Sequence, residues 1–167
     1  MSRLAALFPA LLLALPAAAI AGPAENKAVA SRVILEKMGQ GRFDIQPELY
    51  GPGFVAHGFG RHFTLAEDEA SGRQLRAAFP NLKVKLDRII AEGDLVALHW
   101  SAVGTNTVAA APFPGNGKSV SVDGMSFFRF ADGKIVEEWS TYDNLTIMQQ
   151  LGLIPSKQVN APAEPRP

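Results

Sequence analysis

Four side chains able to bind or react recur at every second position near the end of the chain: Glu137, Trp139, Thr141 and Asp143. Side chains two apart in a β-strand lie on one face, so the four should project together. A carboxylate in an apolar cavity can act as a general base or acid when its pKa moves toward neutral pH. Trp139 would supply a desolvating wall and a stacking surface for a flat substrate. Asp143 is therefore the first candidate for catalysis.

Asp143 also has a structural interpretation. The residues after it change to a helical pattern, with Leu145, Met148 and Leu151 on one side and Gly152 at the end. Aspartate directly before a helix is a preferred N-cap residue. The catalytic and capping roles are compatible, and both stay open at this point.

The three histidines are the next candidates. His57 lies in the glycine-rich segment 51–60 and could orient the acid or shuttle a proton, although a surface or structural role is the alternative. We expect His62 to be exposed. His99 lies beside a tryptophan in a strand-like run, so alternation should turn one of these two toward the cavity.

Composition excludes several kinds of site. The chain has no cysteine, which rules out thiol nucleophiles, zinc-thiolate sites and iron–sulfur clusters. The H-x-x-x-x-H spacing at 57–62 is interrupted by glycines and does not fit one helix face, so we predict no metal site. Neither a G-x-S-x-G elbow nor a phosphate-binding glycine loop is present. With a formal net charge of zero and no basic block, we expect no nucleic-acid partner.

Residues 1–21 have the pattern of a secretory signal. Arg3 precedes an apolar run, and Ala19-Ile20-Ala21 gives a small-x-small cleavage site. The run is shorter than the roughly 20 residues of a membrane span, although an uncleaved anchor is the alternative. We therefore predict cleavage after Ala21, a periplasmic or secreted location, and no stable membrane span after cleavage.

The rest of the chain divides into a mobile N-terminus (22–26), one domain (27–155) and a disordered tail rich in proline and alanine (156–167). A helix is predicted from Lys27 to about Gly39, with Lys37 on its polar face. A second helix is predicted after Thr64, which has the spacing of a capping box with Glu67. The segment 51–60 is too glycine-rich for a regular element and is predicted as a shaped loop.

After Asn81 the sequence predicts a meander of four strands: 82–90, 95–107, 118–130 and 134–143. Helices followed by hairpins are typical of an α+β fold. A three-residue turn at 131–133 would pair Met125 with Trp139 and put Met125 and Arg129 on the face of Asp143. A two-residue turn would replace them with Phe128 and Ser126.

Both faces of the third strand are apolar, with Val120, Val122, Phe128 and Phe130 opposite Met125 and Phe127. Both faces of such a sheet must be covered. The helices can cover one face, and we expect a second copy of the chain to cover the other. The sequence thus predicts a homodimer through the sheet face.

The segment G-K-I-V-E-E-W-S-T-Y-D-N-L-T-I-M-Q-Q-L-G at 133–152 resembles the C-terminal signature of the SnoaL-like polyketide cyclases, in the NTF2-like superfamily. Further likeness lies in L-Y-G-P-G-F-V-A-H at 49–57 and G-D-L-V-A-L-H-W-S-A-V-G-T-N at 93–106. The likeness covers most of residues 27–155. It implies an NTF2-like cone, in which N-terminal helices pack on a strongly curved antiparallel sheet, often as a dimer.

The resemblance also implies intramolecular aldol condensation without cofactor or metal. It assigns Asp143 as the acid/base, places His57 at the pocket mouth and matches Trp139 to the tryptophan of the family's strand. Asn106 stands where many relatives have histidine, and His99 where many have arginine. The expected ligand-binding set is Trp139, Asn106, His99, Met125, Phe127 and Arg129.

Two hypotheses of different class result. The first is an exported acid/base enzyme of the cyclase, aldol or isomerase type, acting on a small, largely apolar carbonyl compound. The second is a non-catalytic binding protein that holds a small apolar ligand in the same pocket.

Overall fold

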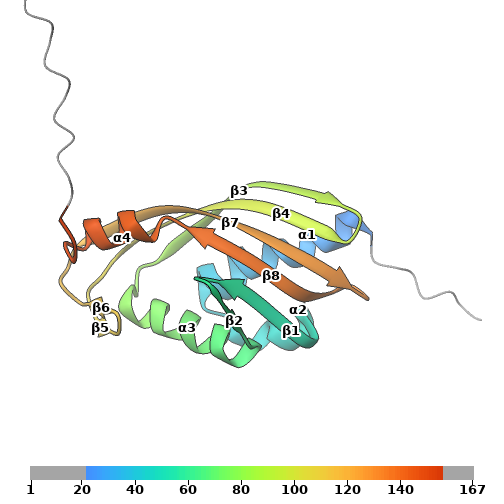
Figure 1. Cartoon of the computed structure of the whole chain (residues 1–167), viewed down its shortest axis with the longest axis horizontal. Coiled ribbons are helices and arrows are strands. Elements are labelled where there is room, and N and C mark those ends of the chain that lie inside the picture. Colours follow the sequence, from blue (N-terminus) through green and yellow to red (C-terminus); the bar gives the residue numbers. More distant parts are fainter. Residues whose placement is uncertain (1–21, 156–167) are drawn as a thin grey trace, which may run out of the picture.

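The computed structural model describes residues 22–155, in which a curved sheet lies over a layer of helices (Figure 1). The predicted signal peptide and C-terminal tail lie outside the described residues. Within 22–155, no helix has the length and apolar character needed to span a membrane.

The helical segments are short apart from two. They are α1 (Pro23–Arg32), the π-helical η1 (Val33–Met38), the 3-10 turn η2 (Phe43–Ile45), α2 (Gln46–Leu49), α3 (Leu65–Ala78) and α4 (Asn144–Gln150). The strands are β1 (Tyr50–Gly58), β2 (Arg61–Phe63), β3 (Lys83–Glu92), β4 (Leu95–Thr105), β5 (Ala109–Ala110), β6 (Phe113–Pro114), β7 (Ser119–Ala131) and β8 (Lys134–Tyr142).

Six strands form the main sheet in the order β2-β1-β8-β7-β4-β3. The predicted four-strand meander is confirmed as β3, β4, β7 and β8, and the α+β, NTF2-like cone is confirmed with it. The sheet is mixed rather than purely antiparallel, because β1 runs parallel to β8. Helices α1, α2 and α3 cover one side of the curve (Figure 1).

Strand β1 replaces the shaped loop predicted for 51–60. Its pairing with β8 shifts register between Tyr50 and Val55, which leaves the glycine-proline-glycine stretch as an irregularity inside the strand. Gly53 has a φ of +72°, a conformation that glycine adopts at little cost. Glycine and proline here mark a bulge in a strand, and the prediction of a loop was wrong for that reason.

The N-terminal helix begins earlier than predicted. Helix α1 starts at Pro23, and Asn26 is already buried, so residues 23–26 are helical rather than mobile. The helix continues directly into the π-helical turn η1. Lys37 in that turn is only 4% exposed, which contradicts its predicted place on the polar face. A π-turn inserts an extra residue and rotates the residues after it, and such turns occur often at functional sites.

The β7–β8 hairpin has a two-residue turn, so the favoured three-residue turn was wrong. Asp132 and Gly133 both have positive φ values, 50° and 73°, and Ala131 pairs with Lys134. A register shift lies next to this turn, with Val136 as the extra residue in β8, and beyond it Phe127 pairs with Trp139. This shift restores the alternation, and Met125, Phe127 and Arg129 do share the face of Trp139.

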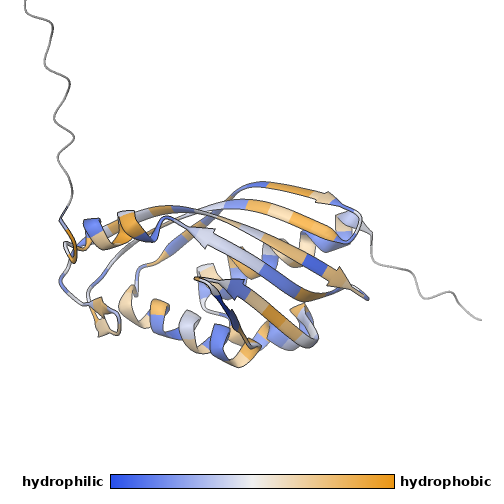
Figure 2. Ribbon diagram, viewed as in Figure 1, coloured by the Kyte–Doolittle hydropathy of each residue, from blue (hydrophilic) through white to orange (hydrophobic). Residues whose placement is uncertain are grey.

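The two faces of the sheet differ in cover. The inner face packs on the helices and carries the core, which includes Leu98, Trp100, Phe128, Phe130 and Ile135. The outer face leaves large apolar side chains in solvent: Ile90 is 71% exposed, Phe127 48% and Trp139 38%. Hydrophobic segments of β3 and β4 gather at their shared hairpin end (Figure 2).

Candidate functional site

Alternation along β8 turns Glu138, Ser140 and Tyr142 toward the inner face, opposite to Trp139. These three side chains are only partly buried, although they lie on the covered side of the sheet. Tyr142 packs at the edge of the core, and burial raises the pKa of its phenol. The inner face of β8 therefore carries polar groups beside the apolar core.

A chain of hydrogen bonds fixes Glu138. The indole Nε1 of Trp100 donates to Ser126 Oγ at 3.2 Å, and Ser126 Oγ lies 2.7 Å from Ser140 Oγ. The Ser140 hydroxyl donates to Glu138 Oε1 at 2.6 Å. The second carboxylate oxygen, Oε2, is buried and has no hydrogen-bond partner among the described residues. Glu138 is thus held by one oxygen and has the other free.

Lys37 faces the same interior from the π-helical turn. Its ammonium donates to the Tyr50 hydroxyl at 2.8 Å and to the carboxylate of Asp68 on α3. Burial alone would lower the pKa of Lys37, but the Tyr50 oxygen and the Asp68 carboxylate raise it above its usual value. For the Tyr50 phenol, by contrast, burial raises the pKa. Near neutral pH Lys37 is therefore a cation beside a neutral phenol.

Burial raises the pKa of Glu138 to about 7. The positive charge of Lys37 opposes this rise, and the negative charge of Asp68 adds to it. A carboxyl group with a pKa near 7 can both take up and release a proton at neutral pH. Strong perturbation by burial and by specific charges is typical of functional carboxylates.

Asp143 lies on the outer side, one residue beyond the end of β8. It is exposed and accepts hydrogen bonds from the Thr146 backbone N–H at 2.9 Å and from Thr146 Oγ1 at 2.5 Å. These bonds lower its pKa, the opposite of what a base working at neutral pH needs. The geometry is that of the N-cap of α4, and a catalytic role for Asp143 stays a prediction.

The structure brings His57, Trp139 and Arg129 together on the outer face. His57 and Arg129 contact the carboxylate of Glu137, and Trp139 lies against His57. His57 Nε2 lies 2.7 Å from Glu137 Oε1, and the Arg129 guanidinium donates to Glu137 Oε2 at 2.9 and 2.7 Å. The His57 ring stacks on Trp139 with centroids 5.0 Å apart. His57 does not contact Asp143 and instead forms part of a separate surface cluster.

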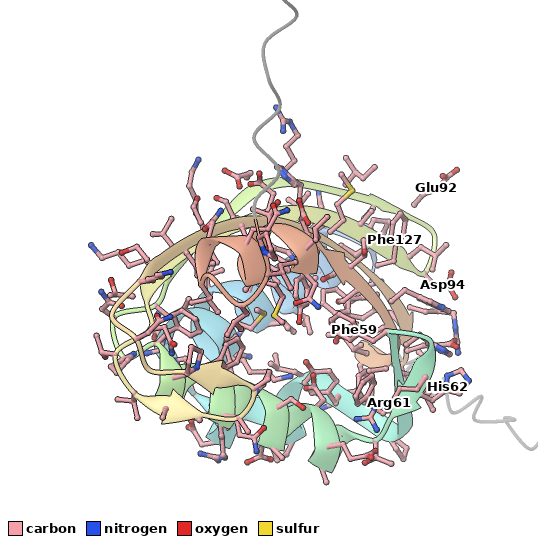
Figure 3. The ribbon with its side chains drawn as sticks, turned by 60° about the vertical axis from the view of Figure 1, so that its left-hand side comes forward. Phe59, Arg61, His62, Glu92, Asp94 and Phe127 are labelled. Atoms are coloured by element: carbon pink, nitrogen blue, oxygen red, sulfur yellow. The ribbon has the colours of Figure 1, made fainter. Side chains whose placement is uncertain are left out.

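This cluster continues onto the β1–β2 hairpin. His62 Nδ1 lies 2.8 Å from His57 Nδ1, and Phe59 at the hairpin turn is 63% exposed. Figure 3 shows Phe59, Arg61 and His62 of the hairpin gathered on the same side of the molecule as Phe127. The cluster is therefore a surface feature next to exposed aromatic side chains.

Two other expected ligand-binding residues lie at one hollow on the outer face. His99 and Met125 border a hollow of about 310 Å³, together with Asp123, Gly124, Thr141, Tyr142 and Asp143. Asn106 lies elsewhere and is fully buried. Its amide donates to Ala78 O and Val108 O and accepts from Gly115 N–H, so it organises the loop after β4.

Sequence reasoning missed the interior residues Glu138, Lys37, Tyr50 and Asp68. One signal was available: Glu138 comes directly after Glu137, so alternation places one of the two carboxylates on each face of β8. Which face the helices cover is decided by tertiary packing. The burial of Lys37 had no signal in the local pattern.

One known protein family matches most of the chain. The SnoaL-like polyketide cyclase family matches residues 24–151. No curated protein has a detectable sequence match.

Solved structures share the fold. AclR, a proposed hydroxylase from Streptomyces galilaeus, is 24% identical with a TM-score of 0.74, over 81% of this chain and 85% of AclR. IdmH, a proposed polyketide cyclase from Streptomyces antibioticus, is 26% identical with a TM-score of 0.67, over 76% of this chain and 98% of IdmH. A proposed polyketide cyclase from Bacillus cereus is 27% identical with a TM-score of 0.67, over 78% of this chain and 82% of that protein. The chain belongs to the SnoaL-like polyketide cyclase family.

Proposed function

We propose that this protein is a general acid/base enzyme of the cyclase or isomerase type, and that Glu138 transfers the proton. The substrate would be a small, largely apolar carbonyl compound bound inside the cone. The observation that carries the proposal is Glu138 itself, an inward-facing carboxyl with a pKa of about 7 and a free Oε2. The names of IdmH and of the Bacillus cereus relative are consistent with this class of reaction.

The proposed step begins with proton removal from the carbon next to a carbonyl group. Glu138 Oε2 takes the proton. The electron pair of the C–H bond moves toward the carbonyl group, whose oxygen becomes the negative oxygen of an enolate. The positive charge of Lys37 and the hydroxyl of Tyr50 would stabilise the negative oxygen of that enolate. In a cyclase the enolate carbon attacks a second carbonyl of the same molecule, and Glu138 returns the proton to the new alkoxide. In an isomerase the proton returns to another carbon.

The apolar side chains on the inner side of the sheet suit such a substrate. Trp100, Phe54 and Phe128 belong to the core on the inner side of the sheet, and they would desolvate both the carboxylate and the ligand. Lys37 is already bonded to Asp68 and Tyr50, so its charge is fixed in place before a ligand enters. Preorganised charge of this kind is the usual source of enolate stabilisation.

Deuterium exchange tests the proposal without knowledge of the natural substrate. The purified protein is incubated in D₂O with a panel of small apolar ketones and β-keto esters, and exchange next to the carbonyl is measured by NMR. Glu138→Gln should abolish the exchange that exceeds the buffer rate. Glu137→Gln is the matched control, because Glu137 precedes Glu138 and lies on the opposite face.

Three outcomes would contradict Glu138 as the base. Exchange that is unchanged in Glu138→Gln rules it out. Exchange that is lost in Asp143→Asn but kept in Glu138→Gln would move the chemistry to Asp143. Tight retention of the test compounds without any exchange would favour a non-catalytic binding protein.

We further propose that the chain forms a homodimer through its outer sheet face. Ile90, Leu95, Phe127 and Trp139 are exposed there at 71%, 42%, 48% and 38%. Analytical ultracentrifugation should give a dimer for the parent protein and a monomer for Phe127→Glu. A monomeric parent at tens of micromolar would refute this arrangement.

We also propose that the protein acts outside the cytoplasm after removal of residues 1–21. Support comes from the basic start, the apolar run and Ala19-Ile20-Ala21. Cell fractionation and N-terminal sequencing should recover a chain that begins at Gly22. Recovery of the uncut chain in the cytoplasm would contradict this location.

A further inference from the structure

We propose that Asp87, His99 and Asp123 bind one divalent transition-metal ion on the outer face of the sheet. They come from three adjacent strands, β3, β4 and β7. One ligand atom from each residue lies within 4.8 Å of the other two. The site is separate from Glu138 and does not depend on the proposed acid/base reaction.

Strand register explains why three distant residues converge. Ser101 of β4 pairs with Asp123 of β7, so His99, two residues earlier on the same face, is a diagonal neighbour of Asp123. The β3–β4 pairing shifts register between Leu86 and Arg88, and this irregularity places Asp87 next to the same spot. The irregularity in β3 thus supplies a ligand that a regular strand would not present there.

The separation between His99 and Asp123 suits a shared ion. His99 Nε2 lies 3.9 Å from Asp123 Oδ1, whereas a direct hydrogen bond would bring these atoms to about 3 Å. Two ligand atoms that each lie about 2.1 Å from one ion are roughly 3 to 4 Å apart. The spacing is therefore too long for a hydrogen bond and appropriate for two members of one coordination sphere.

Two polar atoms of the cluster are buried without hydrogen bonds: Asp87 Oδ2 and His99 Nδ1. Lys85 donates to the other oxygen of Asp87, Oδ1, at 2.6 Å, so this carboxylate has one oxygen engaged and one available. Buried polar atoms in folded proteins almost always have a partner. A bound ion would give Asp87 Oδ2 the interaction that the neighbouring side chains do not, while His99 would bind the ion through one ring nitrogen only.

The donor set indicates the class of ion. One imidazole nitrogen with two carboxylate oxygens suits Zn²⁺, Mn²⁺ or Fe²⁺, whereas Ca²⁺ and Mg²⁺ prefer oxygen alone. Three protein ligands leave coordination positions open for water or a small ligand. Those positions would face the hollow of about 310 Å³ that Met125, Thr141 and Asp143 help to line.

Zinc titration tests the site. The purified protein is stripped with a chelator, and Zn²⁺ binding is measured by competition with a chromophoric chelator. We expect one ion per chain, and a loss of affinity of about tenfold or more in both Asp123→Asn and His99→Gln. Asp123 is largely exposed, with a side chain 74% accessible, so its substitution should leave folding intact.

The histidine pair on the same face provides the control. His57 Nδ1 and His62 Nδ1 lie 2.8 Å apart and could bind zinc on their own. His62→Gln should leave the affinity unchanged if the ion lies at Asp87, His99 and Asp123. Loss of binding in His62→Gln with full binding in Asp123→Asn would overturn the proposal. Absence of any zinc binding by the parent at tens of micromolar would overturn it as well.

Discussion

Glu137 and Glu138 are consecutive residues with opposite environments. Glu137 points to the outer face, where hydrogen bonds from Arg129 and His57 lower its pKa. Glu138 points inward, where burial raises its pKa to about 7. The two residues have the same chemistry and differ only in the face of β8 from which they project. The face of the strand therefore decides which carboxylate can carry a proton at neutral pH.

The outer and inner faces of the sheet also differ in how their other charged side chains are paired. Outer carboxylates such as Asp143 and Glu137 have close partners that keep them ionised and fixed. On the inner side, Lys37 forms an ion pair with Asp68, and its positive charge also acts on the carboxyl group of Glu138. Substitutions on each face test this distinction.

The largest effect is expected from Asp68→Ala. It leaves the Lys37 ammonium buried with the Tyr50 hydroxyl as its remaining hydrogen-bond partner, and removing one partner of a buried ion pair costs about 3 to 5 kcal/mol. Urea unfolding measures the loss. The double variant Lys37→Met with Asp68→Ala should recover most of the stability. If Asp68→Ala has no effect, Lys37 is not an obligatory buried cation.

The next effect concerns pH. Between about pH 4.5, the ordinary pKa of glutamate, and pH 7, folded Glu138 keeps a proton that the unfolded chain has released. Stability should therefore fall as pH rises through this window, by about 3 kcal/mol in total. Glu138→Gln should remove this fall, whereas Glu137→Gln should keep it. Unfolding free energies at a series of pH values provide the measurement.

Gly124→Ala tests packing on the inner face. The added methyl group would overlap the indole of Trp100, and overpacking of this kind costs about 2 kcal/mol. Its neighbour Met125 points outward and is 55% exposed, so Met125→Ala should cost no more than about 0.5 kcal/mol in the monomer. Thermal unfolding compares the two. Equal losses would mean that the faces do not differ in packing as described.

The smallest effect is expected at Asp143. Asp143→Ala should cost about 1 kcal/mol because the N-cap of α4 is lost, and Asp143→Asn should be nearly neutral because asparagine caps equally well. Chemical denaturation distinguishes the two variants. A large loss of function in Asp143→Asn at unchanged stability would restore Asp143 as the catalytic acid.

Much of the fold could be predicted from the sequence because local signals were strong. Alternation and glycine turns identified β3, β4, β7 and β8, and Thr64 with Glu67 marked the start of α3, where the capping box is present. Strand β1 was missed because its glycines and proline are also those of a loop. Its partner β8 lies far away in sequence, so no local pattern shows the pairing.

The candidate site was harder to predict. Alternation grouped Met125, Phe127, Arg129 and Trp139 correctly on one face, but it does not show which face the helices cover. That depends on packing between distant segments. Lys37 was assigned to solvent because lysine is seldom buried, and only its contacts with Tyr50 and Asp68 explain its position.

The parallel pairing of β1 with β8 also has a consequence for the order of folding. His57 of β1 and Trp139 of β8 are partners across about eighty residues, and closing such a long loop is slow. Among the strands of residues 22–155, β8 is the last to leave the ribosome. Until it emerges, β1 has no partner on that side, and Lys37 cannot be enclosed opposite Glu138. The N-terminal half should therefore stay open during synthesis, and the interior site should form in the final step of folding.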